Sequence, residues 1–184
     1  MTPFARGEGG GGIRPWRLGA RPRKIFLVAH IASAGAWIGI DVVMGVLVFT
    51  ALFGDQGTRA LCYRALELFA VWPLIATGLV CLASGVVLGL GTKWGLIRYW
   101  WVAAKLVLNV VLVALVAVAL RPEVIEKAEQ GRRFVAGEPA SLAVGDLIFP
   151  PIVSPTLLLV AFVLAVFKPW GLIGERRLSK RGTR

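Results

Sequence analysis

The stretch that decides the fold is Ile25–Phe53, IFLVAHIASAGAWIGIDVVMGVLVFTALF. It is apolar throughout except for a few small polar residues, and His30 and Asp41 are its ionisable side chains. A helix needs about 20 apolar residues to cross the hydrocarbon core of a bilayer. At about 1.5 Å per residue this stretch would extend roughly 43 Å. It therefore predicts an uncleaved transmembrane helix, because the apolar run is longer than the roughly 7–15 residues of a signal-peptide core.

The composition of the whole chain supports a membrane domain. Of 184 residues, 57% are hydrophobic, and the mean hydropathy is +0.75. Soluble domains have about 45–50% apolar residues even with glycine counted. The two cysteines, Cys62 and Cys81, would lie about 28 Å apart on one continuous helix, which is too far for a disulfide. The absence of a CxxC motif or a Cys/His cluster gives no support to a zinc or iron–sulfur site.

Apolar stretches predict four spans, at residues 25–53, 68–90, 99–120 and 147–167. The fold class predicted from them is all-α, a polytopic four-helix transmembrane bundle in up-down-up-down order. The basic segments 1–24 and 168–184 are predicted as tails outside the membrane, the first of them disordered. Within the second span, Gly78, Gly85 and Gly89 form a small-residue seam that favours close helix packing.

Glycines and prolines mark the expected ends and breaks of these helices. The segment 54–58, GDQGT, is predicted as a turn. Arg121-Pro122 should close the third span, because proline cannot continue a helix comfortably, and 123–146 should be an amphipathic or partly ordered loop. Three prolines crowd the start of the fourth span: Pro150, Pro151 and Pro155. Because they remove three backbone donors, we expect 149–156 not to be a regular helix.

The distribution of charge predicts the orientation. The net charge is +11, and nearly all of the 21 Lys and Arg residues lie outside the apolar stretches. Fourteen of them fall on the side of the termini and six on the other side. The positive-inside rule then places both termini in the cytoplasm of a plasma-membrane protein. The partner expected for the basic tails is anionic lipid, not nucleic acid.

Two polar stripes on the first and third spans form a candidate intramembrane site. His30, Trp37 and Asp41 lie within about 20° of one line along their helix. The second stripe consists of Arg98, Trp101, Lys105 and Asn109. Ionisable groups inside a membrane are costly and usually face the bundle interior or water. The site predicted from both stripes is His30, Trp37, Asp41, Arg98, Lys105 and Asn109.

Depth along the helices suggests which members pair. Asp41 and Asn109 both lie near the centre of their spans, whereas Lys105 lies about 7 Å and His30 about 13 Å toward the cytoplasmic side. We therefore expect Asp41 to face the bundle, in its protonated form, with Asn109 as its hydrogen-bonding partner. Lys105 is expected to extend toward the headgroups, and His30 to be solvated or hydrogen-bonded near the interface.

Tyr63–Val111 carries a resemblance to a known group of proteins. The pattern LGTxWGLxRxxWVxxKLxL is present as Leu90-Gly91-Thr92, Trp94-Gly95-Leu96, Arg98, Trp101-Val102 and Lys105-Leu106, preceded by Glu67. His30 and Trp37-x-Gly39 match as well. This region resembles a family of small actinobacterial four-span membrane proteins of unknown function, which implies four helices in the plasma membrane and no known activity. A fainter likeness is to copper-resistance membrane domains, whose further His residues this chain lacks.

Three functional hypotheses follow. The chain carries no nucleophile elbow, P-loop, paired carboxylates or HExxH motif, so an enzyme is not expected, and no cofactor or metal is predicted. The first hypothesis is a non-catalytic interaction or accessory component that packs against itself or a partner. The second is a small proton or ion conduit or carrier that uses Asp41 and the Arg98–Lys105–Asn109 stripe. The third is a haem- or metal-binding redox component, with His30 as its ligand.

Overall fold

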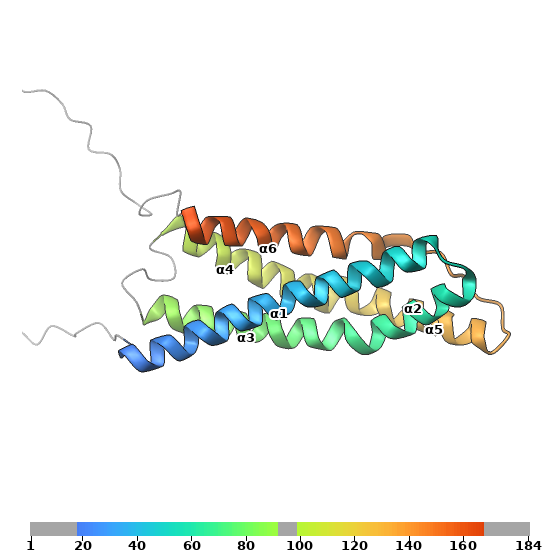
Figure 1. The fold of residues 1–184 in the computed structure, drawn as a ribbon, viewed down its shortest axis with the longest axis horizontal. Coiled ribbons are helices and arrows are strands. Elements are labelled where there is room, and N and C mark those ends of the chain that lie inside the picture. Colours follow the sequence, from blue (N-terminus) through green and yellow to red (C-terminus); the bar gives the residue numbers. More distant parts are fainter. Residues whose placement is uncertain (1–17, 92–98, 168–184) are drawn as a thin grey trace, which may run out of the picture.

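The computed structural model describes residues 18–91 and 99–167, and within these ranges the chain is an all-α four-helix bundle. Its long helices run alternately up and down, as predicted, so that the start of α1 and the end of α6 lie at the same end (Figure 1). The elements are α1 Ala20–Phe53, α2 Gln56–Phe69, α3 Val71–Leu90, α4 Trp100–Leu115, η1 Val116–Leu120, α5 Arg121–Val135, η2 Gly145–Ile148 and α6 Pro150–Phe167. The described part contains four helical stretches long and apolar enough to cross a membrane.

The helices extend beyond the predicted spans. Helix α1 begins at Ala20, so the predicted tail 1–24 ends earlier than expected. Residues 1–17 and 168–184, where the two tails were predicted, lie outside the described residues, as does the connection 92–98.

The second span is longer than 68–90, because α2 and α3 together run from Gln56 to Leu90. They are separated by a break at Ala70. The break follows from Pro73, which has no N–H to donate to the carbonyl of Phe69. The predicted turn 54–58 is short, because Asp55 already caps α2: the Thr58 N–H donates to Asp55 Oδ1 at 2.7 Å.

The prediction that Arg121-Pro122 closes the third helix is wrong. The chain stays helical from Trp100 to Val135, so most of the predicted loop 123–146 is α5. The π-helical segment η1 lies immediately before the proline, and the Arg121 N–H donates to the Val116 carbonyl five residues back. A π turn is wider than an α turn, and such turns are found mostly as single insertions in helices. Here it accommodates Pro122 without ending the helix.

The prediction of an irregular stretch at 149–156 is also wrong. Helix α6 is continuous from Pro150 to Phe167, and the Val153 N–H donates to the Phe149 carbonyl at 2.9 Å. Pro150 and Pro151 occupy the first turn, where the N–H groups of a helix have no intrahelical partner anyway. Only Pro155 lies inside the helix, and the helix continues on both sides of it.

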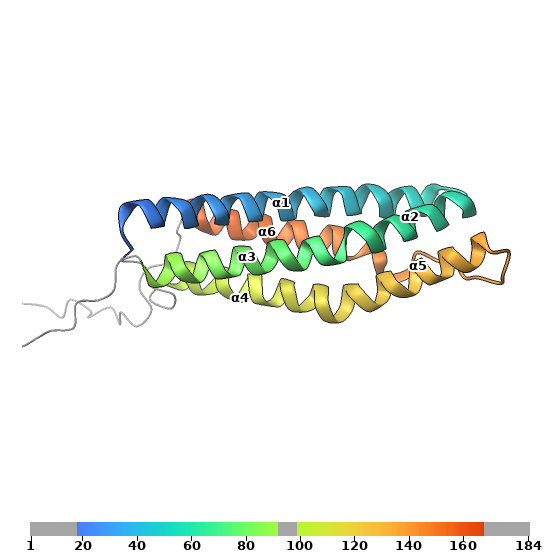
Figure 2. The same ribbon diagram turned by 90° about the horizontal axis from the view of Figure 1, so that it is seen from below.

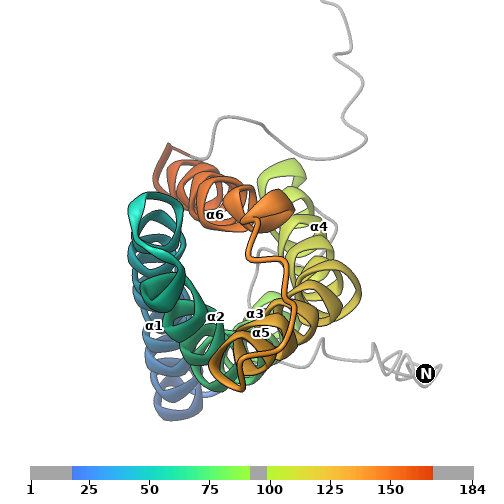
Figure 3. The same ribbon diagram turned by 90° about the vertical axis from the view of Figure 1, so that its right-hand side faces the viewer.

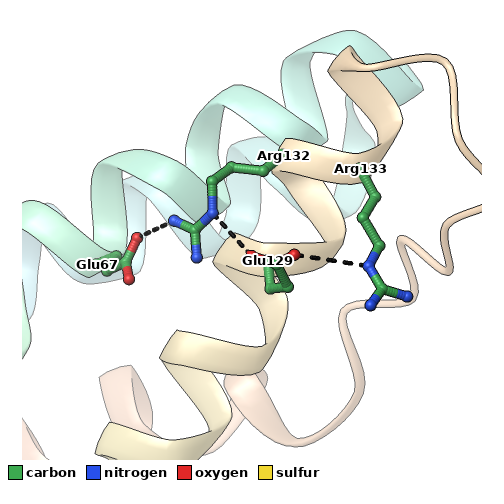
Figure 4. Close-up of polar contacts among 4 residues, drawn as sticks. All are labelled: Glu67, Glu129, Arg132 and Arg133. Carbon is green, nitrogen blue, oxygen red and sulfur yellow. Dashed lines mark hydrogen bonds and ion pairs between the residues drawn. The ribbon is translucent and has the colours of Figure 1, made fainter.

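Helices α2 and α5 lie side by side at the end of the bundle away from the described termini (Figures 2 and 3). They come close at Gly131, where a Cβ atom would lie 2.8 Å from the Ala60 carbonyl oxygen. Arg132 on α5 bridges the two helices by pairing with Glu67 on α2 and, at 2.9 Å, with Glu129 (Figure 4). This pair of helices therefore packs through a glycine contact and an exposed ion-pair network.

The core of the bundle lies where α1 crosses α3. Trp37 is fully buried there against Gly78, because a Cβ atom on Gly78 would collide with the Trp37 ring and with Val113. Gly85, seven residues beyond Gly78 on α3, lies against the His30 ring. Its ideal Cβ position is 3.1 Å from His30 Cε1. Two members of the predicted glycine seam, Gly78 and Gly85, thus lie where α1 and α3 pack together.

Candidate functional site

Asp41 lies inside the bundle, on the face of α1 that it shares with Trp37. Only 1% of Asp41 is exposed and Trp37 is fully buried. The spacing of four residues places both side chains on one side of a helix. The predicted inward orientation of Asp41 is confirmed.

A hydrogen-bonded chain links Asp41 to α6. The Trp37 indole N–H donates to Ser154 Oγ at 3.1 Å, and the Ser154 hydroxyl donates to Asp41 Oδ2 at 2.7 Å. Among the described residues, Asp41 Oδ1 is buried and has no hydrogen-bonding partner. The prediction that Asn109 is the partner of Asp41 is therefore wrong, because Ser154 occupies that place.

Asp41 forms part of the wall of a cavity of about 470 Å³, which we call the Asp41 cavity. The cavity lies between α1, the end of α4 with η1, and the start of α6, and most of its lining is apolar. Its polar lining residues are Asp41, Glu123, Asp146 and Ser154. Glu123 is paired with Lys127, with 3.4 Å between Nζ and Oε1. The described lining carries no positive charge, so the cavity is acidic.

A second cavity of about 440 Å³ lies toward the other end of the bundle, and we call it the His30 cavity. Residues of α1, α3, α4 and α6 line it, and the lining is again mostly apolar. The polar and basic residues in its wall are Arg23, His30, Cys81, Lys105 and Asn109. Leu112, which is 3% exposed, lines both cavities. This single leucine of α4 therefore lines both a basic cavity and an acidic one.

His30 is held against α3 by hydrogen bonds. Its Nδ1 lies 2.9 Å from the Cys81 carbonyl oxygen and 3.2 Å from Ser84 Oγ. A carbonyl only accepts, so Nδ1 carries a proton and donates it to the Cys81 carbonyl. The described residues hold no group of three or more His, Cys, Asp or Glu side chains placed to bind a metal ion. The hydrogen-bonded arrangement expected for this histidine is confirmed.

The structure describes three of the four residues of the second predicted stripe. Arg98 lies outside the described residues. Lys105 Nζ lies 4.6 Å from the centroid of the Trp101 ring, within the range of a cation–π contact. Asn109 Oδ1 is buried without a hydrogen-bonding partner in the described structure. The structure thus places Lys105 and Asn109 in the cavity of His30, and Asp41 in the other cavity.

Several residues of the site escaped the sequence analysis. Ser154 was overlooked because the prolines around it suggested an irregular segment, although it is a polar residue inside an apolar run. Glu123 and Asp146 were assigned to a loop, because Pro122 was expected to end the helix. The π segment η1, which contributes Val116, Ala119 and Leu120 to the Asp41 cavity, has no clear sequence signal beyond the proline that follows it.

Neither a protein-family model, nor a curated protein, nor a solved structure matches this chain. The resemblance to actinobacterial four-span proteins therefore stays a prediction, and the functional argument rests on the site itself.

Proposed function

We propose that this protein is a small carrier or conduit for protons in the plasma membrane, with Asp41 as the group that takes up and releases the proton. The observation that carries the proposal is the buried Asp41 in the wall of a mostly apolar cavity, with one carboxyl oxygen lacking a partner among the described residues. Ionisable side chains at such depth are costly and mark ion paths or proton relays.

The two cavities would let a proton approach Asp41 from either end of the bundle. The Asp41 cavity has Glu123 and Asp146 in its wall, at the end where α5 and η2 lie, and the His30 cavity has Arg23 and Lys105 at the opposite end. Trp37 and Leu112, which are 0% and 3% exposed, fill the space between them. The described conformation is therefore closed between the two cavities, and proton transfer across the membrane requires Trp37 and Leu112 to move. That requirement fits a carrier better than an open pore.

The orientation completes the proposal. By the positive-inside rule both termini are cytoplasmic, so the His30 cavity faces the cytoplasm and the Asp41 cavity faces the outside. We expect the anionic lipids of the inner leaflet to be the partner of the basic tails. A reporter fused to either terminus that is active on the outer side would contradict this orientation.

Proton flux into proteoliposomes tests the proposal. The full-length protein is reconstituted with a trapped pH-sensitive dye, and a membrane potential is imposed with potassium and valinomycin. We expect a flux above that of protein-free liposomes, which Asp41→Asn abolishes, because an amide cannot carry the proton. Asp55→Asn is the matched control, since it makes the same change at the exposed cap of α2. Wild-type flux no greater than that of empty liposomes, or full flux in Asp41→Asn, would overturn the proposal.

The alternative is a non-catalytic accessory protein that assembles with itself or with a partner. Its support is the exposed apolar surface of α2, where Leu61 and Leu68 are 65% and 84% exposed. Cysteine cross-linking from position 61 in membranes tests it. A specific cross-linked dimer or heteromer, together with absent proton flux, would favour this role over proton transport.

A further inference from the structure

We infer that the Asp41 cavity binds a lipophilic organic cation, which competes with the proton for Asp41. The inference rests on the proposed function and names the substrate class of the same site. A cation that enters the cavity displaces the proton of Asp41, and a returning proton displaces the cation, so that the cation competes with the proton that the carrier moves.

The size and lining of the cavity fit such a ligand. Sites for small organic molecules are clefts of roughly 300–1,000 Å³ with mostly apolar walls and few polar groups, and this one measures about 470 Å³. Its apolar wall includes Met44, Leu74 and Val116, from three different helical segments. A hydrated inorganic ion would find too few oxygen ligands there, because the carboxylates are spread over α1, α5 and η2.

The charge of the cavity selects a cation. Asp41, Glu123 and Asp146 line it, and Lys127 is the described cation that offsets Glu123. The lining residues from α3 and α6 are uncharged, and the basic groups His30 and Lys105 lie in the other cavity. Asp41 Oδ1 is the buried oxygen still without a partner. A positive charge beside it would compensate the ionised carboxylate, which is otherwise expensive to bury.

The rim of the cavity provides entry from the lipid. The exposed apolar residues of the lining are Leu115 on α4, Ala119 on η1, Phe149 between η2 and α6, and Val153 on α6. Phe149 is 58% exposed, and an aromatic face at the entrance attracts cations. A cation that dissolves in the bilayer can therefore reach Asp41 without first crossing the polar mouth at Glu123 and Asp146.

Binding of tetraphenylphosphonium to the purified full-length protein in detergent tests the inference. The cation is titrated calorimetrically, and proton release is followed in weakly buffered solution. We expect about one proton released per cation bound, and an affinity that falls as the pH is lowered. Asp41→Asn should abolish proton release and weaken binding at least about tenfold, or about 1.4 kcal/mol. Asp55→Asn should behave as wild type, and circular dichroism checks that each variant is folded.

A second variant and a neutral ligand make the test specific. Ala119→Trp fills the rim from an exposed position, so it should weaken binding without unfolding the protein. Triphenylphosphine oxide, which is similar in shape but uncharged, should bind more weakly than the cation and release no proton. Equal binding of both ligands, or equal cation binding by wild type and Asp41→Asn, would overturn the inference.

The outcomes also separate this inference from the proposed function. If proteoliposomes move protons through Asp41 but the cation does not bind, only the substrate class is wrong. If the cation binds with proton release while protons do not cross the membrane, the site is right and the transport proposal is wrong.

Discussion

The two halves of the bundle treat their polar groups differently, although the same stripe of α1 supplies both. In the His30 cavity the imidazole is bonded to the Cys81 carbonyl and to Ser84, and the basic residues Arg23 and Lys105 line the same cavity. In the Asp41 cavity the carboxyl receives one hydrogen bond, from Ser154, and keeps one oxygen unpartnered among acidic neighbours. Spacing along α1 placed the two residues on one stripe, and depth alone distinguished them. What distinguishes them is their hydrogen bonding to the other helices. The His30 Nδ1 has partners on α3, whereas Asp41 has Ser154 on α6 as a partner of one oxygen only.

The largest effect on stability is expected where Gly78 packs against Trp37, between the two cavities. Gly78→Ala would place a methyl group into the Trp37 ring and Val113. We expect the free energy of unfolding to fall by about 1–3 kcal/mol, the usual cost of overpacking a core. Reversible unfolding in mixed micelles, followed by circular dichroism, measures it. Gly39→Ala is the control, because nothing lies within 4 Å of its added Cβ. Equal stability of the two variants would mean that this contact is not tightly packed.

The hydrogen-bonded chain on the Asp41 side comes next. Ser154→Ala removes the partner of Asp41 Oδ2 and of the Trp37 indole N–H. We expect a loss of about 1 kcal/mol, in the range of single interhelical bonds in membranes, and a shift of the Asp41 carboxyl band in the infrared spectrum. Thr156→Ala is the matched control, since its hydroxyl bonds only the Ile152 carbonyl of its own helix. An unshifted band in Ser154→Ala would show that the serine does not contact Asp41.

His30 tests the other side of the comparison. His30→Leu removes the hydrogen bonds to Cys81 and Ser84, so we expect a loss of about 0.5–1.5 kcal/mol in unfolding free energy. Tetraphenylphosphonium affinity should stay at the wild-type value, because His30 does not line the Asp41 cavity. The same calorimetric titration measures it, with Thr77→Ala as a control for the loss of a side-chain hydrogen bond within a single helix. Cation binding that depends on His30 would mean that the two cavities act as one site.

The sequence predicted the helices well because their apolar runs are long. It also predicted that Asp41 faces inward, because the helical period fixes which residues share a side. The partner of Asp41 could not be predicted in this way. Matching Asp41 with Asn109 by depth assumed spans of symmetric length. The real helices extend past the predicted ends, so Asn109 lies at the level of Cys81, in the other cavity.

The prolines show a second reason for failure. The rule that proline ends a helix describes an α turn, and it misjudged Pro122 because the preceding π turn removes the conflict. In α6 the rule was applied to prolines of the first turn, where they cost little. Both errors concealed residues of the Asp41 cavity, namely Glu123, Asp146 and Ser154. The acidic character of the site therefore became visible only with the structure.

The smallest effect is expected at the ion-pair network between α2 and α5, which contrasts with the buried Ser154–Asp41 bond. Glu67→Gln weakens the pair with Arg132 at the exposed surface, so its effect on the thermal midpoint should be slight and should vanish at high salt, because exposed charges are screened.

The Arg132 side chain also holds the pKa of Glu129 below its usual range through a hydrogen bond. A lowered pKa stabilises the folded state fully above the unfolded value of about 4.3, and that contribution is lost as the pH falls through the folded value. Thermal unfolding in low and high salt, at neutral pH and below pH 4, measures both dependences. The Ser154→Ala loss should be the same at both salt concentrations, and a salt-independent Glu67→Gln effect would show that packing, not charge, joins α2 to α5.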